Sequence, residues 1–136
     1  MGKRYTTLLS IAGSDSIGGA GIQADIKTCC SMGVYAMTVI TAVTAQNTQG
    51  VSSYSAVEPD LLRAQLKAVL SDVKPDAVKV GMIPDAKSVE IIAAEIGRHK
   101  LRHVVVDPVM VATSGSELST DESVDAVKTS SSPRQS

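Results

Sequence analysis

Short segments rich in β-branched and aliphatic residues alternate along this chain with longer amphipathic segments. The short segments predict strands at 7–12, 34–45, 77–80 and 103–106, with a partly alternating and more exposed strand at 51–57. The longer segments predict helices at 20–33, 59–72 and 85–98, the last of them capped by Asp85. Strands that alternate with helices are typical of βαβ units. We therefore expect an α/β fold with a mainly parallel sheet and flanking helices.

The composition suits one globular domain and argues against several classes of partner. The chain has 136 residues, of which 43% are hydrophobic and 20% are charged. A formal net charge of −1 and only three aromatic residues, all Tyr, disfavour binding to nucleic acid or to an anionic membrane. No apolar run approaches the roughly 18 residues that a membrane-spanning helix needs, so a cytoplasmic location is expected. Cys29 and Cys30 lack the spacing of a zinc site and should point in different directions from their helix.

Small and polar residues gather where the predicted strands end. Gly13 follows the first strand, Gln46 the second, Met82 the third of the core strands and Asp107 the fourth. In parallel α/β sheets, ligands bind at the carboxyl ends of the strands. The pattern therefore predicts a ligand site at this edge of the sheet.

The segment 14–21 joins the first strand to the first helix and is rich in Gly and Ser. Such a segment leaves backbone N–H groups free to face a ligand. It lacks the Gly-Lys-Ser/Thr of a P-loop, and no Asp or Glu between Asp25 and Glu58 is available to bind a ribose. The alternative is a tight turn that lets the helix pack closely on the sheet.

Three side chains near this edge have both a ligand-binding and a local interpretation. Gln46 can present a carbonyl and an NH₂ group to an aminopyrimidine, or it can satisfy loop backbone. Asp25 can face the loop if its helix starts near Gly19, or it can stabilise the helix N-terminus. Asp107 can bind Mg²⁺ through water or act on a substrate hydroxyl, or it can cap its own loop.

Four stretches stand out in order along the chain: SIAGSDSIGGAGIQAD (10–25), VITAVTAQNT (39–48), DAVKVGM (76–82) and VDPVM (106–110). They resemble the motifs of the hydroxymethylpyrimidine/phosphomethylpyrimidine kinases, a family with a ribokinase-like fold. Together they extend the resemblance over residues 6–128.

The resemblance implies an activity and a set of site residues. The activity is the phosphorylation, with ATP and Mg²⁺, of 4-amino-5-hydroxymethyl-2-methylpyrimidine and of its monophosphate in thiamine biosynthesis. Gln46 would hydrogen-bond the aminopyrimidine, and Asp107 would lie near Mg²⁺ and the phosphates. The other residues implied to line the pocket are Gly13, Ala20 (through its backbone), Asp25, Thr44, Met82 and Val109.

Members of this family continue for about as many residues again, and the catalytic and most ATP-binding groups are expected in that further portion. We therefore expect no catalytic residue here, and little or no kinase activity from this chain alone. Residues 1–128 would be the N-terminal part of a truncated ribokinase-like kinase domain, with a weak helix at 121–128 and a disordered polar tail at 129–136. The alternatives are a non-catalytic pyrimidine-binding module, a non-functional remnant and a pyridoxal kinase-type activity. A homodimer that pairs through the strand 51–57 is also left open.

Overall fold

The computed structural model of this chain describes residues 5–107. Its elements are β1 (Thr7–Ser14), α1 (Gly21–Ser31), β2 (Tyr35–Asn47), β3 (Gly50–Ala56), α2 (Pro59–Leu70), β4 (Ala77–Val80), α3 (Ala86–Arg98) and β5 (Val104–Val106). The sheet has the order β3-β2-β1-β4-β5, and every pairing is parallel except that of β2 with β3. The predicted α/β class and mainly parallel sheet are therefore confirmed. Val109, the predicted helix 121–128 and the predicted tail 129–136 lie outside the described residues.

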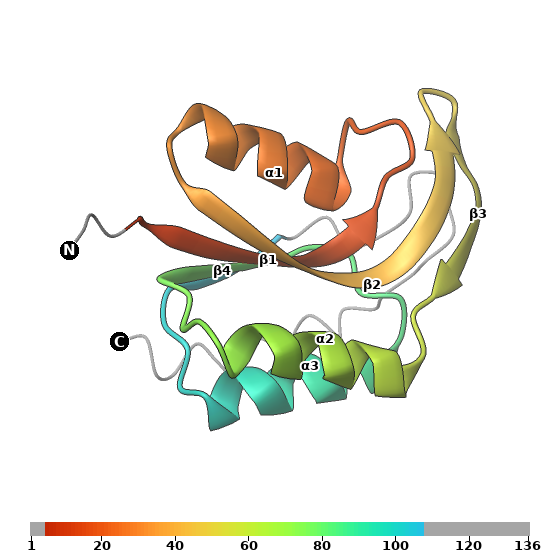
Figure 1. Cartoon of the computed structure of the whole chain (residues 1–136). Coiled ribbons are helices and arrows are strands. Elements are labelled where there is room, and N and C mark those ends of the chain that lie inside the picture. The colour runs from red at the N-terminus through yellow and green to blue at the C-terminus, as the bar shows by residue number, and fades with distance from the viewer. Residues whose placement is uncertain (1–4, 108–136) are drawn as a thin grey trace.

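Helices cover the two faces of the sheet unequally. Helix α1 lies on one face, over β1 and β2, whereas α2 and α3 lie side by side on the other (Figure 1). Alternate residues of β1 point to these two layers, because successive side chains of a strand face opposite ways. Leu9 and Ile11 are fully buried in the core with Leu62 and Leu66 of α2. Ser10, between them, bonds instead to α1.

Strand β2 extends beyond its pairing with β1. Its first part pairs with β1 as far as Val43, and from Ala42 onward it pairs with β3. We expected a buried strand at 34–45, but burial is confined to the middle, where helices cover both faces. Tyr35 and Val43 are 61% and 55% exposed. The strand continues to Asn47 as one arm of an antiparallel hairpin, and its partner β3 is exposed as predicted.

Residues at the ends of two helices adopt the roles that their types predict. Asp85 caps α3 as predicted, and its carboxylate accepts a hydrogen bond of 2.8 Å from the backbone N–H of Ser88. Gly33 follows α1 with a φ of +73°, the left-handed conformation that ends many helices. Within residues 5–107, no helix combines the length and apolar character needed to cross a membrane.

Candidate functional site

The glycine-rich turn between β1 and α1 brings the helix start into contact with the strand end. A Cβ atom added to Gly21, whose φ is +62°, would overlap the backbone carbonyl oxygen of Gly13. On the neighbouring strand, a Cβ on Gly81 would lie 3.0 Å from the Cβ of Ala12. Both contacts depend on the absence of a side chain. The contact of Gly21 supports the interpretation of the segment as a tight turn that packs the helix on the sheet, and its ligand-binding role stays a prediction.

Asp15 organises the inside of this turn. Its side chain, 4% exposed, accepts hydrogen bonds from the backbone N–H groups of Ile17 (3.0 Å) and Ala20 (2.8 Å), and its carbonyl accepts one from Gly18 (3.0 Å). Three N–H groups that we expected to face a ligand are therefore occupied by the protein itself. The carbonyl of Ala20 also accepts a hydrogen bond from the backbone N–H of Ala24 as α1 begins. The ligand-binding role of the Ala20 backbone stays a prediction.

A second side chain bridges the same turn and was missed from the sequence. The Oε1 atom of Gln23 accepts a hydrogen bond of 2.8 Å from the backbone N–H of Asp15, and its Nε2 donates one of 2.8 Å to Oγ of Ser14. The bridge fastens the first turn of α1 to the strand end. A glutamine in the first turn of a helix is common, and its pattern gives no signal of this role.

The β2–β3 hairpin is joined to the glycine-rich turn through Gln46. The Ser16 hydroxyl donates to the Gln46 carbonyl (2.6 Å) and accepts from its backbone N–H (2.8 Å). The Thr44 hydroxyl lies 2.7 Å from the Ser14 carbonyl and 3.1 Å from Oε1 of Gln46. The hydroxyl has one proton, so the shorter contact with Ser14 is the main hydrogen bond and Oε1 of Gln46 is a second, weaker acceptor. The predicted adjacency of Gln46 and the glycine turn is therefore present.

Met82, two residues past the end of β4, closes the same region. A Cβ on Gly13 would lie 3.0 Å from Cε and 3.4 Å from Sδ of Met82, so Met82 occupies the space that the glycine leaves. The buried Thr41 hydroxyl of β2 donates a hydrogen bond of 2.6 Å to the Met82 carbonyl and fixes the backbone there. Gly13, Thr44, Gln46 and Met82, all predicted site residues, thus gather at one edge of the sheet, and we call them the hairpin cluster.

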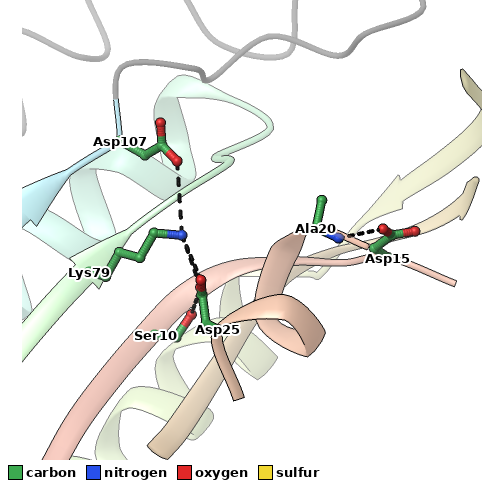
Figure 2. Close-up of polar contacts among 6 residues, drawn as sticks. All are labelled: Ser10, Asp15, Ala20, Asp25, Lys79 and Asp107. Atoms are coloured by element: carbon green, nitrogen blue, oxygen red, sulfur yellow. Dashed lines mark hydrogen bonds and ion pairs between the residues drawn. The ribbon is translucent and has the colours of Figure 1, made fainter. Parts of the chain in front are cut away.

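Asp25 faces the sheet from α1. It is the fifth residue of the helix, beyond the first turn, so it does not serve the N-terminal dipole role considered above. Its Oδ2 accepts a hydrogen bond of 2.7 Å from the buried Ser10 hydroxyl of β1. Its two oxygens lie 2.8 and 3.0 Å from the Lys79 ammonium of β4 (Figure 2).

Asp107 lies on the other side of Lys79, where β5 ends. Its Oδ2 atom is 3.9 Å from the Lys79 ammonium, which therefore stands between two carboxylates (Figure 2). Side-chain exposures of 32% for Lys79, 14% for Asp25 and 34% for Asp107 make this a partly buried array. We call Ser10, Asp25, Lys79 and Asp107 the lysine cluster.

Lys79 was missed as a site residue, although the sequence carried a signal. It sits inside the four-residue strand AVKV, where its neighbours Val78 and Val80 are buried. A lysine in such a strand needs a charged partner, because an unpaired ammonium is costly to bury. The partner itself comes from a helix 54 residues away in sequence, which no local pattern identifies.

The two cysteines differ as their positions on α1 predicted. Cys29 is 6% exposed, whereas Cys30 is exposed. Burial raises the pKa of the Cys29 thiol, and the negative charge of Asp25 raises it further. Cys29 is therefore a packing residue rather than a reactive thiol.

Comparisons with known proteins connect this geometry to one family. A family model described as phosphomethylpyrimidine kinase matches residues 15–136. The hydroxymethylpyrimidine/phosphomethylpyrimidine kinase of Bacillus subtilis is 51% identical over 126 residues, which are 93% of this chain and 46% of the relative. The thiamine biosynthetic bifunctional enzyme TH1 of Arabidopsis thaliana is 51% identical over 113 residues, which are 83% of this chain and 22% of the relative.

Solved structures agree with the sequence relatives. The phosphomethylpyrimidine kinase of Clostridium difficile superposes with a TM-score of 0.80 at 43% identity, covering 90% of this chain and 53% of that one. An ADP complex of Bacillus subtilis pyridoxal kinase gives a TM-score of 0.79 at 36% identity, covering 97% of this chain and 50% of that one. The predicted ribokinase-like fold is confirmed. This chain spans about half the length of these two structures and less than half of the curated relatives above.

Proposed function

Because this chain belongs to the phosphomethylpyrimidine kinase family, we propose that it forms the pyrimidine-binding part of a thiamine-biosynthesis kinase. The substrates would be hydroxymethylpyrimidine and its monophosphate, and ATP would be the phosphoryl donor. This chain spans less than half of the length of its curated relatives. That supports the further proposal that the chain by itself binds the pyrimidine but does not turn over ATP.

The observation that carries this proposal is the hairpin cluster. Ser16 anchors the backbone of Gln46 at the strand ends, and Oε1 of Gln46 lies 3.1 Å from the Thr44 hydroxyl. An amide at this place can accept from the exocyclic amine of an aminopyrimidine while donating to a ring nitrogen. Met82 fills the space beside Gly13, and its soft, polarisable side chain packs well against an aromatic ring. These groups match a small planar ring with a polar edge.

Asp107 is the residue that fits Mg²⁺ in this proposal. Its carboxylate is 34% exposed where β5 ends, and a carboxylate oxygen is the ligand type that Mg²⁺ prefers. Within residues 5–107, no group of three or more His, Cys, Asp or Glu is arranged to hold a metal. Mg²⁺ is usually bound by one or two carboxylates together with water and substrate phosphates. When bound, the ion would neutralise charge on the transferring phosphoryl group.

Titration calorimetry of this chain with hydroxymethylpyrimidine tests the proposal. We expect binding by the unaltered chain and a loss of roughly tenfold or more in affinity for Gln46→Ala, since removing a buried hydrogen-bond partner costs about 1–3 kcal/mol. Gln49→Ala, at an exposed position in the same hairpin, is the matched control and should bind normally. A coupled assay of ATP consumption should show no turnover. Absence of binding by the unaltered chain would overturn the proposal.

A pyridoxal kinase-type ligand is a second candidate, favoured by the 36% identity to the pyridoxal kinase of Bacillus subtilis. Pyridoxal also carries a hydroxymethyl group on an aromatic ring, but it lacks the exocyclic amine that Gln46 would recognise. Titration with pyridoxal in parallel separates the two ligands. Tighter binding of pyridoxal, unaffected by Gln46→Ala, would reverse the preference.

Two further properties complete the proposal. The edge strand β3 is mostly exposed, with Tyr54 at 43%, and it is the segment through which a homodimer would pair. Sedimentation of the chain with and without a Tyr54→Lys substitution tests that pairing.

The cytoplasmic location stays a prediction, and the Arabidopsis relative is described as chloroplastic.

A further inference from the structure

Lys79 connects two parts of the molecule that no backbone pairing joins directly. It lies on β4, opposite Ser10 of β1 and Val105 of β5, so these three side chains share the face of the sheet that carries α1. Helix α1 extends over β1 and β2 on that face (Figure 1). The Lys79 ammonium therefore reaches from the edge of α1 toward the end of β5.

We propose that Lys79 is a positioning residue that sets the location of Asp25 relative to Asp107. The inference rests on the function proposed above, with Asp107 in the Mg²⁺ and phosphate region, and on the family resemblance, which implies that Asp25 lines the pyrimidine pocket. Through Lys79, the ring-binding part of the site and the phosphate-binding part are held at a fixed separation.

The contacts distinguish a strong link from a weaker one. Both oxygens of Asp25 lie within 3.0 Å of the Lys79 ammonium, and the Ser10 hydroxyl holds Oδ2 from a second direction. Asp25 is thereby fixed in orientation by the sheet. The 3.9 Å separation from Asp107 is longer, so it acts through charge more than through a formed hydrogen bond.

Charge explains why a cation is needed at this position. Two carboxylates that face the same region repel each other when no cation stands between them, and partial burial reduces the screening by solvent. Removing the ammonium would leave the Asp25 carboxylate with its hydrogen bond from the Ser10 hydroxyl, and it would remove the positive charge that lies 3.9 Å from Asp107. The proposed pocket would then lose the orientation of one wall, even with the fold intact.

Pyrimidine binding by a double-mutant cycle tests this role. Lys79→Met should weaken binding roughly tenfold, the equivalent of one charge-assisted hydrogen bond, and Lys79→Arg should restore much of it. In an Asp25→Asn background, Lys79→Met should change the affinity less than about twofold, because the group through which it acts is already altered. Lys87→Met, at an exposed position on α3, is the matched control for loss of a lysine. Fully additive effects of Lys79→Met and Asp25→Asn would overturn the inference.

A ligand-free measurement separates this inference from the proposed function. In ¹⁵N-correlated NMR spectra, Asp25→Asn should shift the backbone amide of Asp107, which is held by a hydrogen bond of 2.8 Å to Val80. The same substitution in a Lys79→Met background should leave that resonance in place. If the shift persists without Lys79, the inference fails whatever the chain binds. If the spectra behave as expected but no pyrimidine binds, the proposed function fails and the structural link stands.

Discussion

Gly21, the first residue of α1, lies directly against the carbonyl oxygen of Gly13 at the end of β1, with no room for a side-chain carbon between them. Gly21 also has a φ of +62°, a conformation that L-residues with a side chain rarely adopt. The hairpin cluster and the start of α1 are thus held together by two glycines. This contact determines where Asp25, one helical turn later, meets the sheet.

Gly21→Ala should destabilise the protein by roughly 2–5 kcal/mol, because the left-handed backbone and the overlap with a backbone atom both oppose a methyl group. Chemical denaturation followed by circular dichroism measures the change. Gly97→Ala is the control, since a Cβ at Gly97 in α3 meets nothing within 4 Å. Alanine there should stabilise the helix by about 0.5–1 kcal/mol. Equal effects at the two glycines would contradict the account of the turn.

Gly13→Ala should cost less than about 1 kcal/mol of stability, yet weaken pyrimidine binding. The added methyl would meet the far end of the flexible Met82 side chain at 3.0 Å, and Met82 can move away. The displaced side chain would enter the space proposed for the ring. A shift of the Met82 methyl resonance in Gly13→Ala, together with weaker binding in calorimetry, checks this prediction. Loss of stability comparable to that of Gly21→Ala would show that the Met82 side chain does not move away from the added methyl group.

Asp15→Ala should destabilise the protein by roughly 3 kcal/mol. The substitution leaves the N–H groups of Ile17 and Ala20 without the buried carboxylate that accepts from both of them. Amide hydrogen exchange should accelerate at these two residues. Asp72→Ala, which removes an exposed carboxylate after α2, serves as the control and should change stability by less than about 0.5 kcal/mol. Unchanged exchange at Ile17 and Ala20 would argue against the organising role of Asp15.

Alkylation should distinguish Cys29 from Cys30, with exposed Cys30 reacting first. In a Cys30→Ser variant, Cys29 should react slowly at mildly alkaline pH, because its raised pKa leaves less of the reactive thiolate at any given pH. Asp25→Asn removes a negative charge that contributes to the raised pKa, so it should lower that pKa and speed the reaction. Mass spectrometry of the labelled protein over a range of pH gives the rates. An Asp72→Asn substitution should leave them unchanged.

The order and type of the described elements could be predicted from the sequence, because each carries a strong local pattern. The strand at 77–80 was predicted with the bounds that it has, and Asp85 was recognised as a helix cap. The ends of β1 and β2 were placed too early. Both strands run on through small and polar residues whose strand conformation comes from pairing with a neighbour, and local propensity does not reveal pairing.

The candidate site was predictable only where topology decides it. Parallel strands place Gly13, Gln46 and Met82 at one edge, so their convergence followed from the fold. The roles of Asp15 and Gln23 did not, because hydrogen bonds inside a turn depend on backbone directions that only coordinates supply. The Lys79–Asp25 pair spans 54 residues in sequence and depends on how α1 lies over the sheet, which no periodicity encodes.

Strand β2 belongs to two pairings, and the change from one to the other occurs at Ala42 and Val43. Residues 43–56 contribute no member to the main hydrophobic core, although Thr44 and Gln46 lie among them. In the proposed function, substitutions at exposed positions of this hairpin can therefore alter which aromatic ring is preferred at little cost to folding. A change of substrate would then need only a few exchanges on one projecting arm, while the layers beneath it stay as they were.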